Sequence, residues 1–161
     1  MAPQLIPAEH IRLIVFDLDG TLIDSRKDLA NSINAMLTEF KRQPLPEEII
    51  SEYIGDGAGM LVRRALGDPA DEPLIESALS SFLNHYREHK LDFTYVYDGV
   101  FAALDALKAG RQMAVLTNKP AFPAKAICDA LGLSPYFFRI YGGNSFATKK
   151  PDPEGLTTLI R

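Results

Sequence analysis

The sequence contains a single cysteine, Cys128, among 161 residues. One thiol excludes an internal disulfide and a cysteine-based zinc site, and the apolar helical pattern around Cys128 predicts a small core residue. Positive charge is also scarce, because 17 Lys and Arg stand against 21 Asp and Glu, for a net charge of −4. This balance argues against a nucleic-acid partner, which would require a basic surface.

Membrane and export signals are absent as well. No stretch approaches the roughly 20 apolar residues that span a bilayer, and residues 1–10 lack the basic-then-apolar order of a secretory signal. We therefore expect a cytoplasmic protein without a membrane partner. The composition, with 47% hydrophobic and 24% charged residues, is that of an ordinary globular chain that buries a core.

Three short segments have the unbroken apolar pattern of strands that are covered on both faces of a parallel sheet. They are residues 12–17, residues 112–117 and, as a weaker candidate, residues 138–141. Because parallel strands are joined by helical crossovers, we expect helices after the second and third strands and one before the second.

The expected helices have recognisable ends. Asp98 can cap a helix that Gly110 would end, and residues 119–131 form a helical pattern with Pro120 in its first turn. A last helix is expected to begin at Asp152. Strands and helices in this alternation predict an α/β fold with a parallel sheet.

Residues 25–94 interrupt this alternation. About 70 residues separate the first strand from the next strand–helix unit, far more than a crossover needs. Four helical patterns with short connections fill the interval: residues 29–40, 47–54, 60–66 and 74–89. We therefore expect an inserted helical subdomain at residues 25–94 and a core formed by residues 1–24 and 95–161.

Two acidic residues end the first strand, in the segment Asp17-Leu18-Asp19-Gly20-Thr21. Ligands of open parallel sheets bind beyond the carboxyl ends of the strands, where these carboxylates stand. Two crowded carboxylates repel and require a cation or a shared proton. Gly20 permits a tight turn, and Thr21 can place a hydroxyl or amide beside an anion. The alternative is a plain turn after a strand.

Two further segments bring groups that favour an anion. Thr117 and Asn118 end the second expected strand at the start of a helix, and Lys150 precedes the last helix. Helix starts favour bound anions, and a lysine adds positive charge. Taken singly, the first segment could be an ordinary helix cap and the second a solvated turn.

Together, and in this order, the three segments resemble the signature motifs of the haloacid dehalogenase (HAD) superfamily, and the helical insertion is similar to its type-1 cap. The resemblance extends from about residue 11 to the end of the chain. Within the superfamily, the chain looks most like the phosphoglycolate phosphatases. That likeness rests on the segments Tyr53-Ile54-Gly55-Asp56-Gly57, Arg64-Ala65-Leu66 and Gly142-Gly143.

The resemblance implies a Rossmann-like core, an inserted cap and a Mg²⁺-dependent phosphomonoester hydrolase. By this resemblance, Asp17 attacks phosphorus and becomes an aspartyl-phosphate, while Asp19 protonates the leaving alkoxide and then deprotonates the attacking water. The metal would be held by the Asp17 carboxylate and the main-chain carbonyl of Asp19. The phosphate of the substrate would be bound by motif residues: Gly20, Thr21, Thr117, Asn118 and Lys150.

The cap is expected to face the substrate, a small phosphorylated metabolite. The turn of Gly55, Asp56 and Gly57 is the candidate substrate-facing segment. Arg64 is a candidate second anion contact for a carboxylated substrate such as 2-phosphoglycolate. The alternative places Arg64 on a solvated helix face.

The sequence also departs from the family. The acidic fourth motif, which completes the Mg²⁺ site, is missing, because only eleven residues follow Lys150. We therefore expect a fragment of a longer phosphatase, with weak Mg²⁺ binding and little turnover as given. Two other functions stay open: a sugar-phosphate mutase, which differs by passing the phosphoryl group to a sugar hydroxyl, and a catalytically silent binding module, which natural loss of the fourth motif would favour.

Overall fold

The computed structural model of the chain describes residues 10–161. Its central sheet has three parallel strands in the order β1 (Leu13–Phe16), β4 (Gln112–Leu116) and β5 (Arg139–Tyr141). All three strands were expected from their apolar runs, and the predicted α/β fold is confirmed. β4 is the central strand, whereas β1 and β5 flank it and are less buried than expected.

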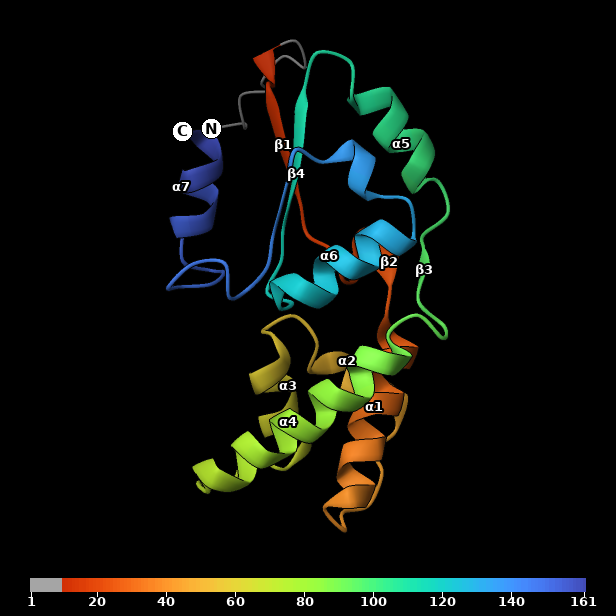
Figure 1. The fold of residues 1–161 in the computed structure, drawn as a ribbon, viewed down its shortest axis with the longest axis vertical. Helices are drawn as coiled ribbons and strands as arrows, with labels where there is room; N and C mark the ends of the chain where they lie inside the picture. Colours follow the sequence, from red (N-terminus) through yellow and green to blue (C-terminus); the bar gives the residue numbers. More distant parts are fainter. Residues whose placement is uncertain (1–9) are drawn as a thin grey trace, which may run out of the picture.

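Helices cover both faces of the sheet (Figure 1). On one face lie α5 (Val100–Leu107), α6 (Ala121–Ala130) and the short 3-10 helix η2 (Ser134–Tyr136), and on the other lies α7 (Glu154–Ile160). The side chains of β4 alternate between the two faces of the sheet. Met113 and Val115 join the larger core with Ile127, while Ala114 packs with Leu159 on the other face. This two-sided burial explains why β4 has no polar alternation.

Three of these helices begin later than their sequence patterns indicate. Gly99, and not Asp98, precedes α5, with φ of 84° and no side-chain cap. Pro120 precedes α6, so Lys119 lies outside the helix because a residue before proline is disfavoured in the α conformation. Before α7, Asp152 stands outside the helix and its carboxylate accepts a hydrogen bond from the Glu154 amide at 2.9 Å.

Four helices follow the first strand and lie beyond the carboxyl ends of the sheet (Figure 1). They are α1 (Arg26–Glu39), α2 (Glu47–Glu52), α3 (Ala58–Ala65) and α4 (Glu72–His89). We call residues 26–89 the helical insertion. Its core is the packing of α1 on α4, through Ile33, Met36 and Phe82 among others. The division of the chain into domains stays a prediction.

A short antiparallel ribbon, absent from the sequence analysis, joins the core to the helical insertion. Its strands are β2 (Ile23–Asp24) and β3 (Tyr95–Val96), which pair Ile23 with Val96 and Asp24 with Tyr95. Each strand has two residues, which is too short for a hydrophobic period to appear. The chain thus enters and leaves the helical insertion at one place.

Two expectations drawn from composition concern single features of the described residues. Cys128 is buried in the larger core, as expected, and burial raises the pKa of its thiol to about 11. Between residues 10 and 161, no helix combines the length and the apolar character that crossing a membrane requires.

Candidate functional site

A cavity of about 40 Å³ lies between the strand ends of the core and the helical insertion. The core contributes four polar residues to its wall: Asp17, Asp19, Thr117 and Lys119. The helical insertion contributes mainly apolar groups, with Tyr86 as the exception. The structure therefore gathers charge on one side of the cavity and hydrophobic surface on the other.

Asp17 directly follows β1 and is the more exposed of the two aspartates, with 41% of its side chain accessible. One carboxylate oxygen accepts a hydrogen bond from the Leu18 amide at 2.7 Å, and the other lies 2.9 Å from the Lys150 ammonium. Segments more than 130 residues apart in the sequence thus meet in one ion pair. Asp17 is held by these contacts with its carboxylate still open to solvent.

Asp19 is more buried, with 12% of its side chain accessible, and its carboxylate contacts Lys119 and Ser25. The Lys119 ammonium lies 3.0 and 3.2 Å from the two carboxylate oxygens, and the Ser25 hydroxyl donates to one of them. Burial by itself lowers the pKa of Lys119, but Asp19 and the neighbouring Tyr86 outweigh it and raise that pKa above its ordinary value. Lys119 is therefore a permanently charged partner of Asp19.

Lys119 was missed as a site residue in the sequence, and so were Ser25 and Tyr86. The signal for Lys119 was available, because it follows Thr117 and Asn118 and precedes a proline, which keeps it out of α6. Ser25 stands just before α1, where a serine is expected to cap the helix. Its hydroxyl makes no cap and contacts Asp19 instead.

Thr117 and Asn118 follow β4, and their hydrogen bonds connect this strand end with β5, with Lys150 and with the helical insertion. The Thr117 amide donates to the Tyr141 carbonyl at 3.0 Å, while its hydroxyl oxygen accepts from the Lys119 amide at 3.2 Å. The hydroxyl hydrogen can therefore still be donated to a ligand. The side-chain amide of Asn118 donates to the Lys150 carbonyl at 3.1 Å and to the Gly55 carbonyl at 2.9 Å. It joins the segment that carries Lys149 and Lys150, which we call the lysine loop, to the helical insertion.

Two glycines after β5, Gly142 and Gly143, allow the backbone to pass close to residues 118–121. A Cβ atom on Gly142 would lie 2.3 Å from the Ala121 nitrogen, and one on Gly143 would lie 2.4 Å from the Asn118 carbonyl oxygen. The Gly143 amide donates to the Lys119 carbonyl at 2.8 Å. The backbone after β5 thus positions the segment that carries Thr117 and Lys119.

Gly20 and Thr21 are placed differently from the other candidates. Both are exposed and lie outside the cavity wall. The Gly20 amide donates to the Ile23 carbonyl at 2.9 Å and the Thr21 amide to the Leu18 carbonyl at 3.2 Å. Gly20 has φ of 76°, which fits the expected tight turn. These two amides serve the turn itself in this arrangement.

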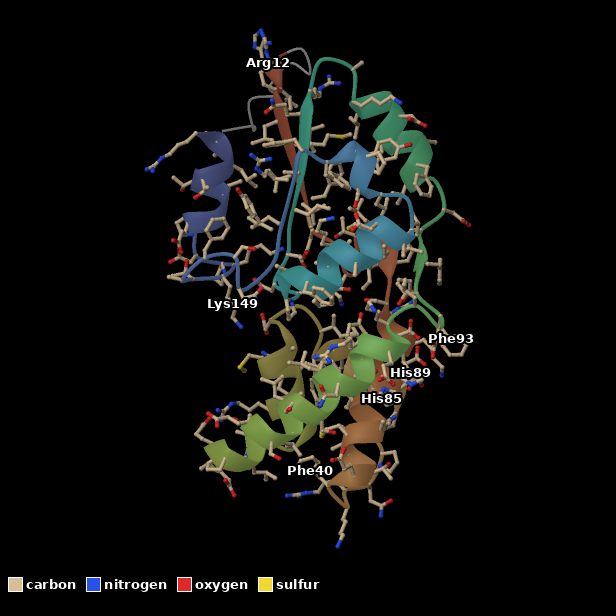
Figure 2. The ribbon with its side chains drawn as sticks, viewed as in Figure 1. Arg12, Phe40, His85, His89, Phe93 and Lys149 are labelled. Carbon is tan, nitrogen blue, oxygen red and sulfur yellow. The ribbon has the colours of Figure 1, made fainter. Side chains whose placement is uncertain are left out.

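The turn before α3 contacts both the cavity and the core. Gly55 and Gly57 line the cavity, whereas Asp56 does not. The carboxylate of Asp56 forms an ion pair with Arg64, and its carbonyl accepts from Lys149 at 2.6 Å. Figure 2 shows Lys149 at the junction of the core and the helical insertion. Arg64 also lies outside the cavity wall, so its charge is used within the helical insertion.

The residues at the strand end fit part of a Mg²⁺ site. Mg²⁺ prefers oxygen ligands and is usually held by one or two carboxylates together with water and phosphate. The exposed Asp17 carboxylate and the Asp19 carbonyl are donors of this kind. Among residues 10–161, no group of three or more His, Cys, Asp or Glu residues is arranged to hold a metal. His85 and His89 stack at 4.3 Å on α4, away from Lys149 (Figure 2).

Comparison with known proteins identifies a matching family. The model of the haloacid dehalogenase-like hydrolases matches residues 14–161, which is nearly the whole chain. Among solved structures, a predicted phosphoglycolate phosphatase from Haemophilus somnus superposes with a TM-score of 0.86 at 34% sequence identity. That superposition covers 92% of this chain and 70% of the other.

Curated relatives are similar over the same region. A phosphoglycolate phosphatase of Neisseria meningitidis is 43% identical over 150 residues, which is 90% of this chain and 64% of the relative. One from Pseudomonas putida is 43% identical over 165 residues, covering 98% of this chain and 60% of the relative. The chain therefore spans less than two thirds of the length of these curated relatives.

Proposed function

Because the chain belongs to the haloacid dehalogenase-like hydrolase family, we propose that the full protein hydrolyses a small phosphomonoester through an aspartyl-phosphate on Asp17. The observation that carries this proposal is the contact of 2.9 Å between Asp17 and Lys150, beside the cavity that Asp19 and Thr117 also line. A carboxylate nucleophile and an anion-binding ammonium are thus held together where a phosphoryl group would be transferred.

The charges of the site support this reaction. A phosphomonoester carries about two negative charges at neutral pH and repels an anionic nucleophile. Lys150 reduces this repulsion beside Asp17, and the free hydroxyl hydrogen of Thr117 can be donated to a phosphoryl oxygen. Positioning and charge neutralisation, more than activation of the carboxylate, would then set the rate.

The proposed chemistry has two steps. An oxygen of Asp17 attacks phosphorus and the ester bond breaks, while Asp19 gives a proton to the leaving alkoxide. Water then attacks the aspartyl-phosphate and gives a proton to Asp19, which restores both residues. In the present contacts, both oxygens of Asp19 accept from Lys119. The cycle must therefore begin with Asp19 protonated, so one of its oxygens exchanges Lys119 for a proton before the first step, and the proton taken from water in the second step restores this state.

We also propose that Mg²⁺ takes part, held by the Asp17 carboxylate and the Asp19 main-chain carbonyl. The ion, when bound, supplies positive charge to the phosphoryl oxygens. Without Mg²⁺ in the reaction mixture, Asp17 would still be paired with Lys150. The two negative charges of the substrate would then face a single ammonium group. Turnover is therefore expected to depend on Mg²⁺.

The relatives at about 43% identity are named phosphoglycolate phosphatases, and this makes 2-phosphoglycolate the first substrate to test. The cavity is small, with room for about three water molecules at its present volume of about 40 Å³. The helical insertion would act as a cap that excludes bulk water from the cavity.

Location in the cytoplasm and the lack of a nucleic-acid or membrane partner stay predictions.

The test is a panel of phosphomonoesters, including 2-phosphoglycolate and sugar phosphates, with the full-length protein and Mg²⁺. We expect Asp17→Asn to abolish turnover and labelling of the protein by a phosphoryl substrate, because the amide cannot form the acyl phosphate. Asp71→Asn is the matched control, since Asp71 caps α4 at an exposed position outside the cavity. Normal labelling of the Asp17→Asn protein would refute the proposal.

A further inference from the structure

Tyr86 is the one polar side chain that the helical insertion contributes to the described cavity wall. The helical insertion otherwise contributes two glycines and six apolar residues to this wall: Leu29, Ile54, Ala58, Leu61, Phe82 and Leu83. Arg64 and Asp56, the charged candidates of the helical insertion, lie outside this wall and bind each other. Any hydrogen bond from a side chain of the helical insertion to a ligand in the cavity must therefore come from Tyr86.

The hydroxyl of Tyr86 is buried and has no hydrogen-bond acceptor within residues 10–161, since its charged neighbour, the Lys119 ammonium, can only donate. The residue as a whole is 3% exposed. A buried hydroxyl without a partner destabilises a protein, so such groups are rare in native structures and call for an explanation. The two side-chain atoms of this kind among the described residues are the Tyr86 hydroxyl and the Asn118 amide oxygen. Both belong to residues at this site.

The ring of Tyr86 is held firmly, so its hydroxyl has a defined position. The ring stacks on Phe82, with centroids 5.7 Å apart and planes at 8°. On the core side, the Lys119 ammonium lies 4.7 Å from the ring centroid, within the range of a cation–π contact. The charges of Lys119 and Asp19 both act on the hydroxyl, and its hydrogen has no acceptor among the described residues.

The charge around Tyr86 favours an anionic acceptor. A groove of about 410 Å³ adjoins the cavity and shares Tyr86 and Leu83 with it. Arg87 and Lys90 line this groove, and no acidic side chain does among the described residues. In the cavity itself Asp17 and Asp19 are paired with Lys150 and Lys119, so Arg87 and Lys90 add positive charge on the side where Tyr86 stands.

We propose that the Tyr86 hydroxyl donates a hydrogen bond to a carboxylate on the organic part of the phosphomonoester, and that the helical insertion selects carboxylated substrates through this bond. The proposal rests on the function proposed above. It assigns a binding role to Tyr86 and no part in the transfer of the phosphoryl group. The hydroxyl would then gain its missing partner only when substrate is bound.

The test compares 2-phosphoglycolate with ethyl phosphate, in which a methyl group replaces the carboxylate. With the full-length protein and Mg²⁺, the ratio of kcat/KM for 2-phosphoglycolate to that for ethyl phosphate should fall roughly 10- to 100-fold in Tyr86→Phe, the range expected for a hydrogen bond to a charged acceptor. Tyr136→Phe is the matched control. Its hydroxyl donates to Asp105 at 3.3 Å, outside the cavity, and the ratio should stay at the wild-type value.

Stability of the free protein gives a second readout. Because Tyr86→Phe keeps the ring and removes an unpartnered hydroxyl, the Tm without substrate should be unchanged or a few degrees higher. A purely structural hydroxyl would show the opposite result, a lower Tm with an unchanged substrate ratio. That result would overturn the proposal, as would an equal loss of kcat/KM on both substrates.

The two proposals can fail separately. If the wild-type protein hydrolyses both esters and the ratio is unchanged in Tyr86→Phe, the reaction stands and the role of Tyr86 is wrong. If the wild-type protein hydrolyses neither, the proposed reaction fails, and calorimetric binding of 2-phosphoglycolate decides the role of Tyr86. Binding weakened at least roughly 10-fold by Tyr86→Phe would support that role, and unchanged or undetectable binding would overturn it.

Discussion

The pair of Lys119 and Asp19 is the most deeply buried ion pair among residues 10–161, with 4% and 12% of the two side chains accessible. Desolvation of two charges is costly, and mutual attraction offsets it only while both charges are present. Asp19 has one other side-chain partner, the Ser25 hydroxyl. The ionised carboxylate therefore depends on Lys119 for its stability in this position.

We expect Lys119→Met to destabilise the protein by about 3–5 kcal/mol, because an uncompensated carboxylate would be left in a buried site. The measurement is urea unfolding at pH 7. In the double variant Lys119→Met with Asp19→Asn, the charge is gone and a large part of the loss should be recovered. A single variant as stable as the wild type, or a double variant with no recovery, would contradict this account of the pair.

The residues near the cavity differ in how well the sequence predicted them. Asp17 and Thr117 both line the cavity, as expected for residues at neighbouring strand ends that meet at one edge of a sheet, and their roles stay predictions. Arg64 lies outside the cavity wall because it pairs with Asp56, whose position depends on the shape of a turn eight residues earlier, and its contact with substrate stays a prediction. Tyr86 left no signal, since an aromatic residue on an apolar helix face is indistinguishable in sequence from a core residue.

At the scale of secondary structure, long apolar patterns were predictable and short pairings were not. β4 carries an unbroken apolar run and the helices α1 and α4 carry clear hydrophobic periods, and the structure has each of them where its pattern predicts it. The ribbon of β2 and β3 has two residues in each strand, and its pairing depends on contacts between residues about 70 positions apart. Such a pairing is a property of the folded chain and is absent from any local pattern.

The close packing after β5 predicts an element-scale effect. We expect Gly143→Ala to cost about 2 kcal/mol or more, because the added Cβ would lie 2.4 Å from the Asn118 carbonyl oxygen and backbone must shift. Turnover should fall with stability, since Asn118 joins the lysine loop to the helical insertion. Thermal unfolding and phosphatase assays of the same samples would measure both effects.

Gly59→Ala provides the matched control for this variant. Gly59 lies in α3 with no atom within 4 Å of an added Cβ, and alanine favours a helix over glycine. Its stability should be unchanged or up to about 1 kcal/mol higher. If both variants lose the same stability, the tight contact at Gly143 is not the cause.

At the scale of the whole molecule, one buried carboxylate ties together the two ends of the helical insertion. Asp28, in the first turn of α1, is 1% exposed. It accepts hydrogen bonds from the amides of Phe93 and Thr94 and from the Thr94 hydroxyl, at distances from 2.6 to 3.1 Å. These partners lie just before β3, where the chain returns to the core. Asp28 therefore joins the start of the helical insertion to the segment by which the chain returns to the core.

We expect Asp28→Asn to destabilise the protein by about 2–3 kcal/mol, because one oxygen that accepts from backbone amides becomes an NH₂ group facing the same donors. Asp71→Asn makes the same chemical change at the exposed start of α4, where asparagine is as good a cap as aspartate, so it should cost only a few tenths of a kcal/mol. Denaturant unfolding compares the two. Because Asp28 joins segments 65 and 66 residues apart, its loss should also expose amides at Phe93 and Thr94 to hydrogen exchange before the sheet unfolds. Equal losses in the two variants would mean that burial of the Asp28 carboxylate contributes nothing beyond an ordinary cap.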